Sequence, residues 1–122
     1  MESGSGYEGD IDIVEMFGSA GKIPFETHLN RLEDSAKPLL LELRTFAQSL
    51  GANVLEDIRP HRVVYSKTMN FRIFLDIEPS GDSLIIVTRS GRSAPPASLT
   101  VKTREDLKDA KKHIAEAYQK IQ

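Results

Sequence analysis

The spacing of the apolar residues changes twice along this chain, and that change constrains the fold more than any other feature. Leu39, Leu43, Phe46 and Leu50 recur every three or four residues, which is the period of an amphipathic helix. From residue 53 the period becomes two, and β-branched and aromatic residues become frequent, as in strands. The helical period returns between residues 107 and 121. The pattern predicts an α+β fold with a sheet between helices.

The strand pattern occurs at residues 54–58, 62–66, 71–77 and 83–88, and a fifth short stretch at 99–102 follows a loop rich in Gly and Pro. Residues 79–82 form a tight turn, so the third and fourth strands are expected to make a hairpin. We therefore expect an antiparallel meander sheet of about five strands. In the third strand, strict alternation predicts two faces, a buried one and a wet one. The buried face would hold Phe71, Ile73, Leu75 and Ile77, and the wet face Arg72, Phe74 and Asp76.

Helix signals flank the sheet on both sides. Apolar residues at 25, 29 and 32 predict a short first helix, and Ser35 is a candidate cap for a second helix that ends before Gly51. Thr103 and Asp106 have the spacing of a capping box at the start of the last helix. We expect two N-terminal helices and one C-terminal helix, all packed on one face of the sheet.

The length of 122 residues is typical of a single domain. Residues 1–22 are acidic, rich in Gly and poor in apolar residues, which predicts a flexible leader followed by one α+β domain over 23–122. An apolar patch at 11–17 would dock loosely on the domain or be gripped by another protein. The chain has no cysteine, no apolar run of membrane-spanning length and no secretory signal pattern, so a cytoplasmic protein without disulfides is expected.

Charge is segregated along the chain. Residues 1–57 carry 11 acidic and 4 basic side chains, whereas residues 58–104 carry 3 acidic and 8 basic ones. A basic sheet face could bind an anion or nucleic-acid phosphates, although RNA readers usually add exposed aromatic rings. The alternative is a solvated sheet edge whose charges resist aggregation. The candidate binding residues are Arg59, His61, Arg62, Arg72, Arg89 and Arg92.

Several motif look-alikes fail physical tests. Residues 4–9 spell G-x-G-x-x-G without a preceding strand or a following helix, and residues 18–22 lack two required positions of a phosphate loop. His28, His61 and His113 have no partner at metal-ligand spacing, and the acids at 10–15 lack the glycine and distal glutamate of a calcium loop. No serine lies in a nucleophile-elbow context. We therefore expect no catalytic residues, no metal and no cofactor.

The sheet and last helix resemble a domain family of unknown function, DUF5655. The resemblance covers 70 to 100 residues and is carried mainly by the hydrophobic pattern. The residues that carry it are Val63, Val64, Tyr65, Asn70, Phe71, Leu99, Val101, Glu105, Asp106, Leu107, Ala117 and Tyr118, with the strand at 84–87. Family members occur alone or appended to restriction-type nuclease domains in proteins described as predicted transporters, which implies an accessory role. The link at residues 90–97 is shorter than in the family, where it is often rich in Gly and contains a histidine.

These observations favour a non-catalytic binding or accessory domain whose ligand is a protein or a peptide. The first alternative is a nucleic-acid accessory domain that uses the basic sheet face. The second is a small-ligand carrier or enzyme with a pocket between helices and sheet. No membrane partner is expected.

Overall fold

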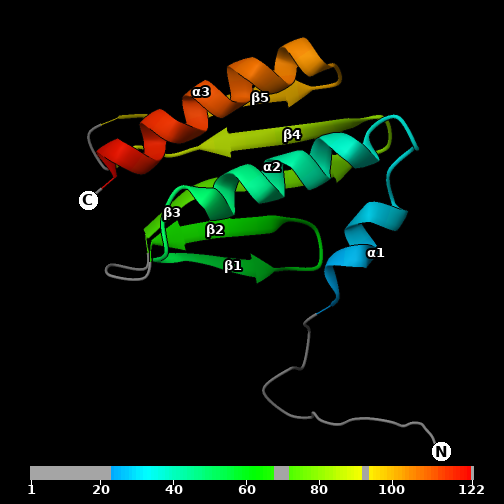
Figure 1. Ribbon diagram of the computed structural model, residues 1–122, viewed down its shortest axis with the longest axis horizontal. Coiled ribbons are helices and arrows are strands. Elements are labelled where there is room, and N and C mark those ends of the chain that lie inside the picture. Colours follow the sequence, from blue (N-terminus) through cyan, green and yellow to red (C-terminus); the bar gives the residue numbers. More distant parts are fainter. Residues whose placement is uncertain (1–22, 68–71, 92–93, 122) are drawn as a thin grey trace, which may run out of the picture.

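The computed structural model describes residues 23–67, 72–91 and 94–121, and the predicted leader at 1–22 lies outside them. This part of the chain is an α+β domain built on one five-stranded antiparallel sheet in the order β1-β2-β3-β4-β5 (Figure 1). The predicted meander is confirmed. In chain order the elements are α1 (Phe25–Asn30), α2 (Lys37–Ser49), β1 (Val54–Ile58), β2 (Val63–Lys67), β3 (Arg72–Ser80), β4 (Ser83–Thr88), β5 (Ala97–Val101) and α3 (Arg104–Lys120).

The two long helices, α2 and α3, cover the same face of the sheet (Figure 1). The core lies between these layers and includes Leu40 and Leu43 from α2, Ile114 from α3, and Leu75 and Ile77 from β3. All five side chains are fully buried. Burying apolar area at this interface is the main term that stabilises such a two-layer fold.

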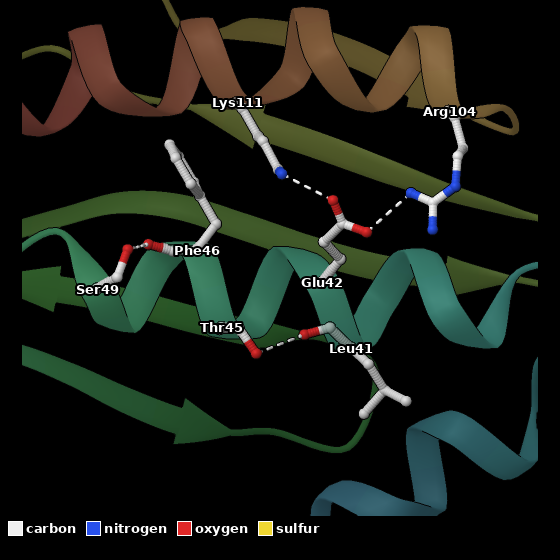
Figure 2. A network of polar contacts seen from close by, with 7 residues as sticks. All are labelled: Leu41, Glu42, Thr45, Phe46, Ser49, Arg104 and Lys111. Atoms are coloured by element: carbon white, nitrogen blue, oxygen red, sulfur yellow. Dashed lines mark hydrogen bonds and ion pairs between the residues drawn. The ribbon is translucent and has the colours of Figure 1, made fainter.

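One carboxylate ties the two long helices together. Glu42 of α2 accepts hydrogen bonds at 2.8 Å from both Arg104 Nη1 and Lys111 Nζ of α3 (Figure 2). These side-chain bonds, Arg104 first and Lys111 second, lower the pKa of Glu42 from its ordinary value of 4.5 to about 2. Figure 2 also shows Thr45 and Ser49 donating back to carbonyl oxygens of α2 itself.

The first helix does not lie on the sheet face as predicted. It sits at one end of the sheet, where the β1–β2 and β3–β4 turns lie (Figure 1). His28 Nε2 lies 2.7 Å from the Arg59 oxygen in the first turn, and Glu33 N donates at 2.8 Å to the Gly81 oxygen in the second. A helix of six residues is too short to bury a face of its own, so it packs at the end of the sheet. His28 of α1 contacts the β1–β2 turn, and Glu33, in the segment after α1, is bonded to the β3–β4 turn.

The helix ends follow the sequence signals only in part. The capping box of Thr103 and Asp106 is present at the start of α3 as predicted. Ser35 does not cap α2, because Ala36 occupies the N-cap position and no side chain bonds the first turn. Gly51 does follow α2, but its backbone is not in the left-handed region; the residue leaves room for Tyr118, whose hydroxyl would lie 2.2 Å from an added Cβ.

The prediction for Phe74 is wrong. Its side chain is fully buried in the core and meets the Tyr118 ring edge to face, with centroids 5.3 Å apart. The reason is a register shift in the β2–β3 pair, where Tyr65 pairs with Leu75 but Ser66 pairs with Ile73. One extra residue in β3 therefore breaks the alternation, and Phe74 and Leu75 both contribute to the core.

A partly buried polar network holds β1 and β2 to α2. Glu56 accepts two hydrogen bonds from the Arg44 guanidinium, at 2.9 and 3.0 Å, and one at 2.7 Å from the Tyr65 hydroxyl. Arg44 also lies over the Phe25 ring, 3.9 Å from its centroid. Burial, and then the bond to Glu56, raise the pKa of Tyr65. Because each buried polar atom of this network has a partner, the network fixes the position of β1 against the helices.

Candidate anion-binding pocket

Asp76 lines a pocket and points to the sheet face opposite the helices. It pairs across the sheet with Val64 and Val87, while its neighbours Leu75 and Ile77 face the core. Its side chain is only 7% exposed. A buried carboxylate needs charged or hydrogen-bonding partners, because removing it from water costs on the order of several kcal/mol of free energy.

Two arginines supply those partners. Arg89 Nη1 donates to Asp76 Oδ2 at 2.5 Å, and Arg62 Nη1 lies 3.7 Å from the same oxygen. Both guanidinium side chains stay accessible, at 39% and 44% exposure. Each guanidinium has five N–H donors, and these contacts engage one nitrogen of each. Asp76 therefore orients two cations that still face solvent.

Two more arginines line the same pocket, which has a volume of about 560 Å³. Arg59 comes from the β1–β2 turn, as Arg62 does, whereas Arg72 begins β3 near the place where β4 leads into Arg89. The two pairs thus come from opposite ends of the sheet. We call the pocket formed by Arg59, Arg62, Arg72 and Arg89 around Asp76 the arginine pocket.

The turn that carries Arg59 and Arg62 is fixed by a hydrogen bond within it and by contacts from Arg31 and His28. Arg59 N donates to the Arg62 oxygen at 2.9 Å, which closes the turn, and Arg31 Nη1 donates to the Pro60 oxygen at 2.5 Å. Buried His28 contacts the Arg59 oxygen through Nε2. Desolvation is the largest effect on the pKa of His28 and lowers it, partly opposed by this backbone contact. A neutral imidazole with its proton on Nε2 fits this environment, because a carbonyl oxygen only accepts.

The other described residues of the pocket lining are apolar. They are Ile73, Gly91, Ala94, Pro96 and Ile121. Four arginines against one aspartate give the lining a formal charge of +3. Its described residues include no hydroxyl, imidazole or thiol group, so the chemistry they offer is anion binding beside an aliphatic wall.

The predicted site residues are partly brought together. Arg59, Arg62, Arg72 and Arg89 meet in the arginine pocket, although they are distributed over 31 positions of the sequence. His61 is exposed in the β1–β2 turn and is not part of the pocket lining. Arg92 lies outside the described residues. Sequence reasoning missed Asp76, whose only signal was an acid between the apolar residues Leu75 and Ile77.

The structure bears on the remaining motif predictions only through the residues that it describes. Within residues 23–67, 72–91 and 94–121, no three His, Cys, Asp or Glu residues form a group that could hold a metal ion. The glycine motifs at 4–9 and 18–22, the acids at 10–15 and the apolar patch at 11–17 all lie outside these residues. In the same described part, each helix is too short or too polar to cross a membrane.

Comparison with protein-family models, curated proteins and solved structures finds no match to this chain. The resemblance to DUF5655 therefore stays a prediction from the residues that carry it.

Proposed function

We propose that this chain is a non-catalytic binding domain that holds an anionic group of a protein or peptide partner in the arginine pocket. The observation that supports the proposal is the convergence of four arginines on one concave site around a buried aspartate. Arginine binds carboxylates and phosphates through its planar fork of donors, and it loses little solvation in doing so. Concave sites of this size commonly bind ligands.

The apolar half of the lining favours a peptide over a nucleic acid. Ile73 and Pro96 offer aliphatic contacts to a side chain next to the bound anion. Single-stranded nucleic acids instead need aromatic side chains on which bases stack. Tyr65 of β2 and Phe74 of β3 are both fully buried. Among the described residues, none that lines the pocket is aromatic.

The test is an NMR titration of the whole chain, read at the arginine Nε–Hε signals, with poly-L-glutamate and inorganic pyrophosphate as separate probes at constant ionic strength. We expect the signals of the arginine pocket to shift and saturate with at least one probe. Arg104 and Arg44 serve as internal references, because both bind glutamates elsewhere in the fold. Pocket signals that shift no more than the two references with either probe refute the proposal.

A matched pair of variants isolates the pocket from general charge. Arg62→Gln combined with Arg72→Gln removes two positive charges from the lining, and Lys108→Gln combined with Lys112→Gln removes two from exposed positions of α3. A hydrogen bond to a charged group contributes about 1.5–3 kcal/mol, and each 1.4 kcal/mol is about tenfold in affinity. The pocket variant should therefore bind the probes at least about tenfold more weakly, and the α3 variant about as tightly as the parent chain.

A second candidate is the nucleic-acid accessory domain, favoured by the basic pocket and by the accessory role that the resemblance to DUF5655 implies. Its signature is salt dependence, because each neutralised phosphate of duplex DNA adds about −0.9 to the slope of log K against log salt. Retention on a DNA column at low salt, lost in the Arg62→Gln, Arg72→Gln variant, would favour this reading. Absence of retention at low ionic strength ends it.

The carrier or enzyme reading is less well supported. It required a ligand site between helices and sheet, and the described part of that layer is filled by buried core side chains such as Leu43, Leu84 and Ile114. Asp76 of the arginine pocket points to the other sheet face.

A further inference from the structure

We infer that the anionic group bound in the arginine pocket is a phosphate monoester on a side chain of a peptide. This inference rests on the proposed function and names its ligand more closely. It is argued from charge, from donor geometry and from the apolar wall of the pocket.

The charge of the lining matches a compact dianion. Four arginines and Asp76 leave a formal charge of +3 around one depression. A second acid, Asp57, accepts from Arg59 Nε at 2.8 Å, but both side chains are about half exposed, so water screens that pair. A carboxylate carries one negative charge, whereas a phosphorylated side chain carries about 1.5 to 2 at neutral pH. A phosphate monoester therefore neutralises more of the positive charge of the lining than a carboxylate does.

The donors also suit a group with three terminal oxygens. Arg62 and Arg89 are both held by the same oxygen of Asp76, so their guanidinium groups are fixed near one point before any ligand arrives. Holding these long side chains in advance reduces the conformational entropy lost on binding. A monoester can accept from several guanidinium groups at once through its three oxygens, while a carboxylate and a phosphodiester each offer only two.

The volume and the apolar wall place the phosphate on a peptide. A phosphoryl group alone fills only part of a pocket of about 560 Å³, which leaves room for a neighbouring group. Ile73, Pro96 and Ile121 line that remaining space. Aliphatic walls gain free energy by covering an apolar side chain, so the residue beside the phosphorylated one is expected to be apolar.

The experiment uses the full chain and fluorescently labelled peptide pools of nine residues, read by anisotropy. Three pools have phosphoserine, phosphothreonine or phosphotyrosine fixed at the centre, and two matched pools have serine or glutamate there. A DNA oligonucleotide and inorganic phosphate, at matched ionic strength, complete the set. We expect one phosphorylated pool to bind at least tenfold more tightly than the glutamate and serine pools. Inorganic phosphate should compete at higher concentration, and the bound fraction should be enriched in apolar residues beside the phosphate.

Charge-conserving variants separate fork recognition from diffuse attraction. Arg62→Lys combined with Arg72→Lys keeps the lining charge but loses the planar donors, and it should weaken the phosphorylated pool by at least tenfold. Lys108→Gln combined with Lys112→Gln should leave binding unchanged, and circular dichroism should report an intact fold for both variants.

The possible failures are distinct. Equal binding of the glutamate pool and the phosphorylated pools overturns the phosphate inference and leaves the proposed function in place. Tighter binding of DNA than of every peptide pool overturns it in favour of the nucleic-acid reading. Weak binding of every peptide pool, together with unmoved pocket signals in the NMR titration, overturns the inference and the proposed function alike.

Discussion

Replacing Gly51 by alanine should destabilise the fold, although the backbone at this position suits any residue. An added Cβ would lie 2.2 Å from the Tyr118 hydroxyl oxygen, 2.8 Å from Asn53 Oδ1 and 3.2 Å from Tyr118 Cζ. The Tyr118 ring cannot swing away at little cost, because it packs edge to face on Phe74 and under the Lys67 ammonium, 4.3 Å from the ring centroid. The clash therefore falls on a ring that is held on two sides.

The magnitude follows from three contributions. Overpacking of this kind costs about 1–3 kcal/mol. Moving the hydroxyl also breaks its 2.9 Å hydrogen bond to Asn53, a further loss of about 0.5–1.5 kcal/mol. Alanine restricts the unfolded chain and returns about 0.4–1 kcal/mol. The expected net loss in the free energy of unfolding is about 0.5–4 kcal/mol, the sum of these ranges.

Urea unfolding followed by far-UV circular dichroism measures this loss directly, as a lower midpoint at unchanged slope. Tyr118→Phe provides the control, since it removes the atom nearest to the new methyl group. In that background Gly51→Ala should lower the free energy of unfolding by less than it does in the parent chain, so the two changes are less than additive in a double-mutant cycle. A neutral or stabilising Gly51→Ala would refute the reasoning.

Three further predictions concern the pH response, the buried network and a turn. The pKa of Glu42 is lower in the folded protein than in the unfolded chain, so its contribution to stability is complete above pH 4.5 and is lost as the pH falls toward about 2. In Glu42→Gln, the urea midpoint should therefore depend less on pH over that range. Tyr65→Phe removes a fully buried donor to Glu56 and should lower the free energy of unfolding by about 1–2 kcal/mol in the same assay. Gly81 has φ of 66°, so Gly81→Ala should cost about 1–2 kcal/mol, measurable as a lower thermal midpoint.

Each of these has a contrary result. An undiminished acid-induced drop in Glu42→Gln would assign the pH response to other carboxylates. A Tyr65→Phe variant as stable as the parent would mean that Arg44 alone satisfies Glu56. Gly81 has open space around it, so a Gly81→Ala variant as stable as the parent would mean that the positive φ alone causes no strain.

The regular parts of the fold were predictable because local signals decide them. The strands have the period of two, residues 79–82 carry the turn chemistry of a hairpin, and Thr103 with Asp106 specifies a helix start by itself. The face of Phe74 was not predictable, because a bulge depends on the register of the neighbouring strand as well as on the residues of β3. Ser35 failed as a cap because the chain between α1 and α2 is bonded to the β3–β4 turn, which sets where α2 begins.

The sequence allowed the arginines of the candidate site to be predicted, but not which other residues they meet in the fold. The sequence singles out the arginines between residues 59 and 92 as a basic cluster. Only the fold brings Arg62 and Arg89 to the same oxygen of Asp76, since the contact spans two strands and a bulge. The apolar half of the pocket includes Ile121, at the other end of the domain sequence, and no local pattern indicates that meeting.

The extra residue in β3 adds a core side chain to this strand without changing which of its residues face the pocket. Phe74 adds an aromatic ring to the core without taking any residue from the pocket face, because the strand turns two successive side chains inward at that point. A substitution at 74 therefore acts on the core alone. Inserting or deleting one residue between Asp76 and the β3–β4 turn would instead turn the side chains on one side of that point to the opposite face of the sheet. Either Asp76 would then point toward the helices, or Ile77 would point toward the arginines. The length of β3 therefore positions the side chains of the core and those of the pocket together.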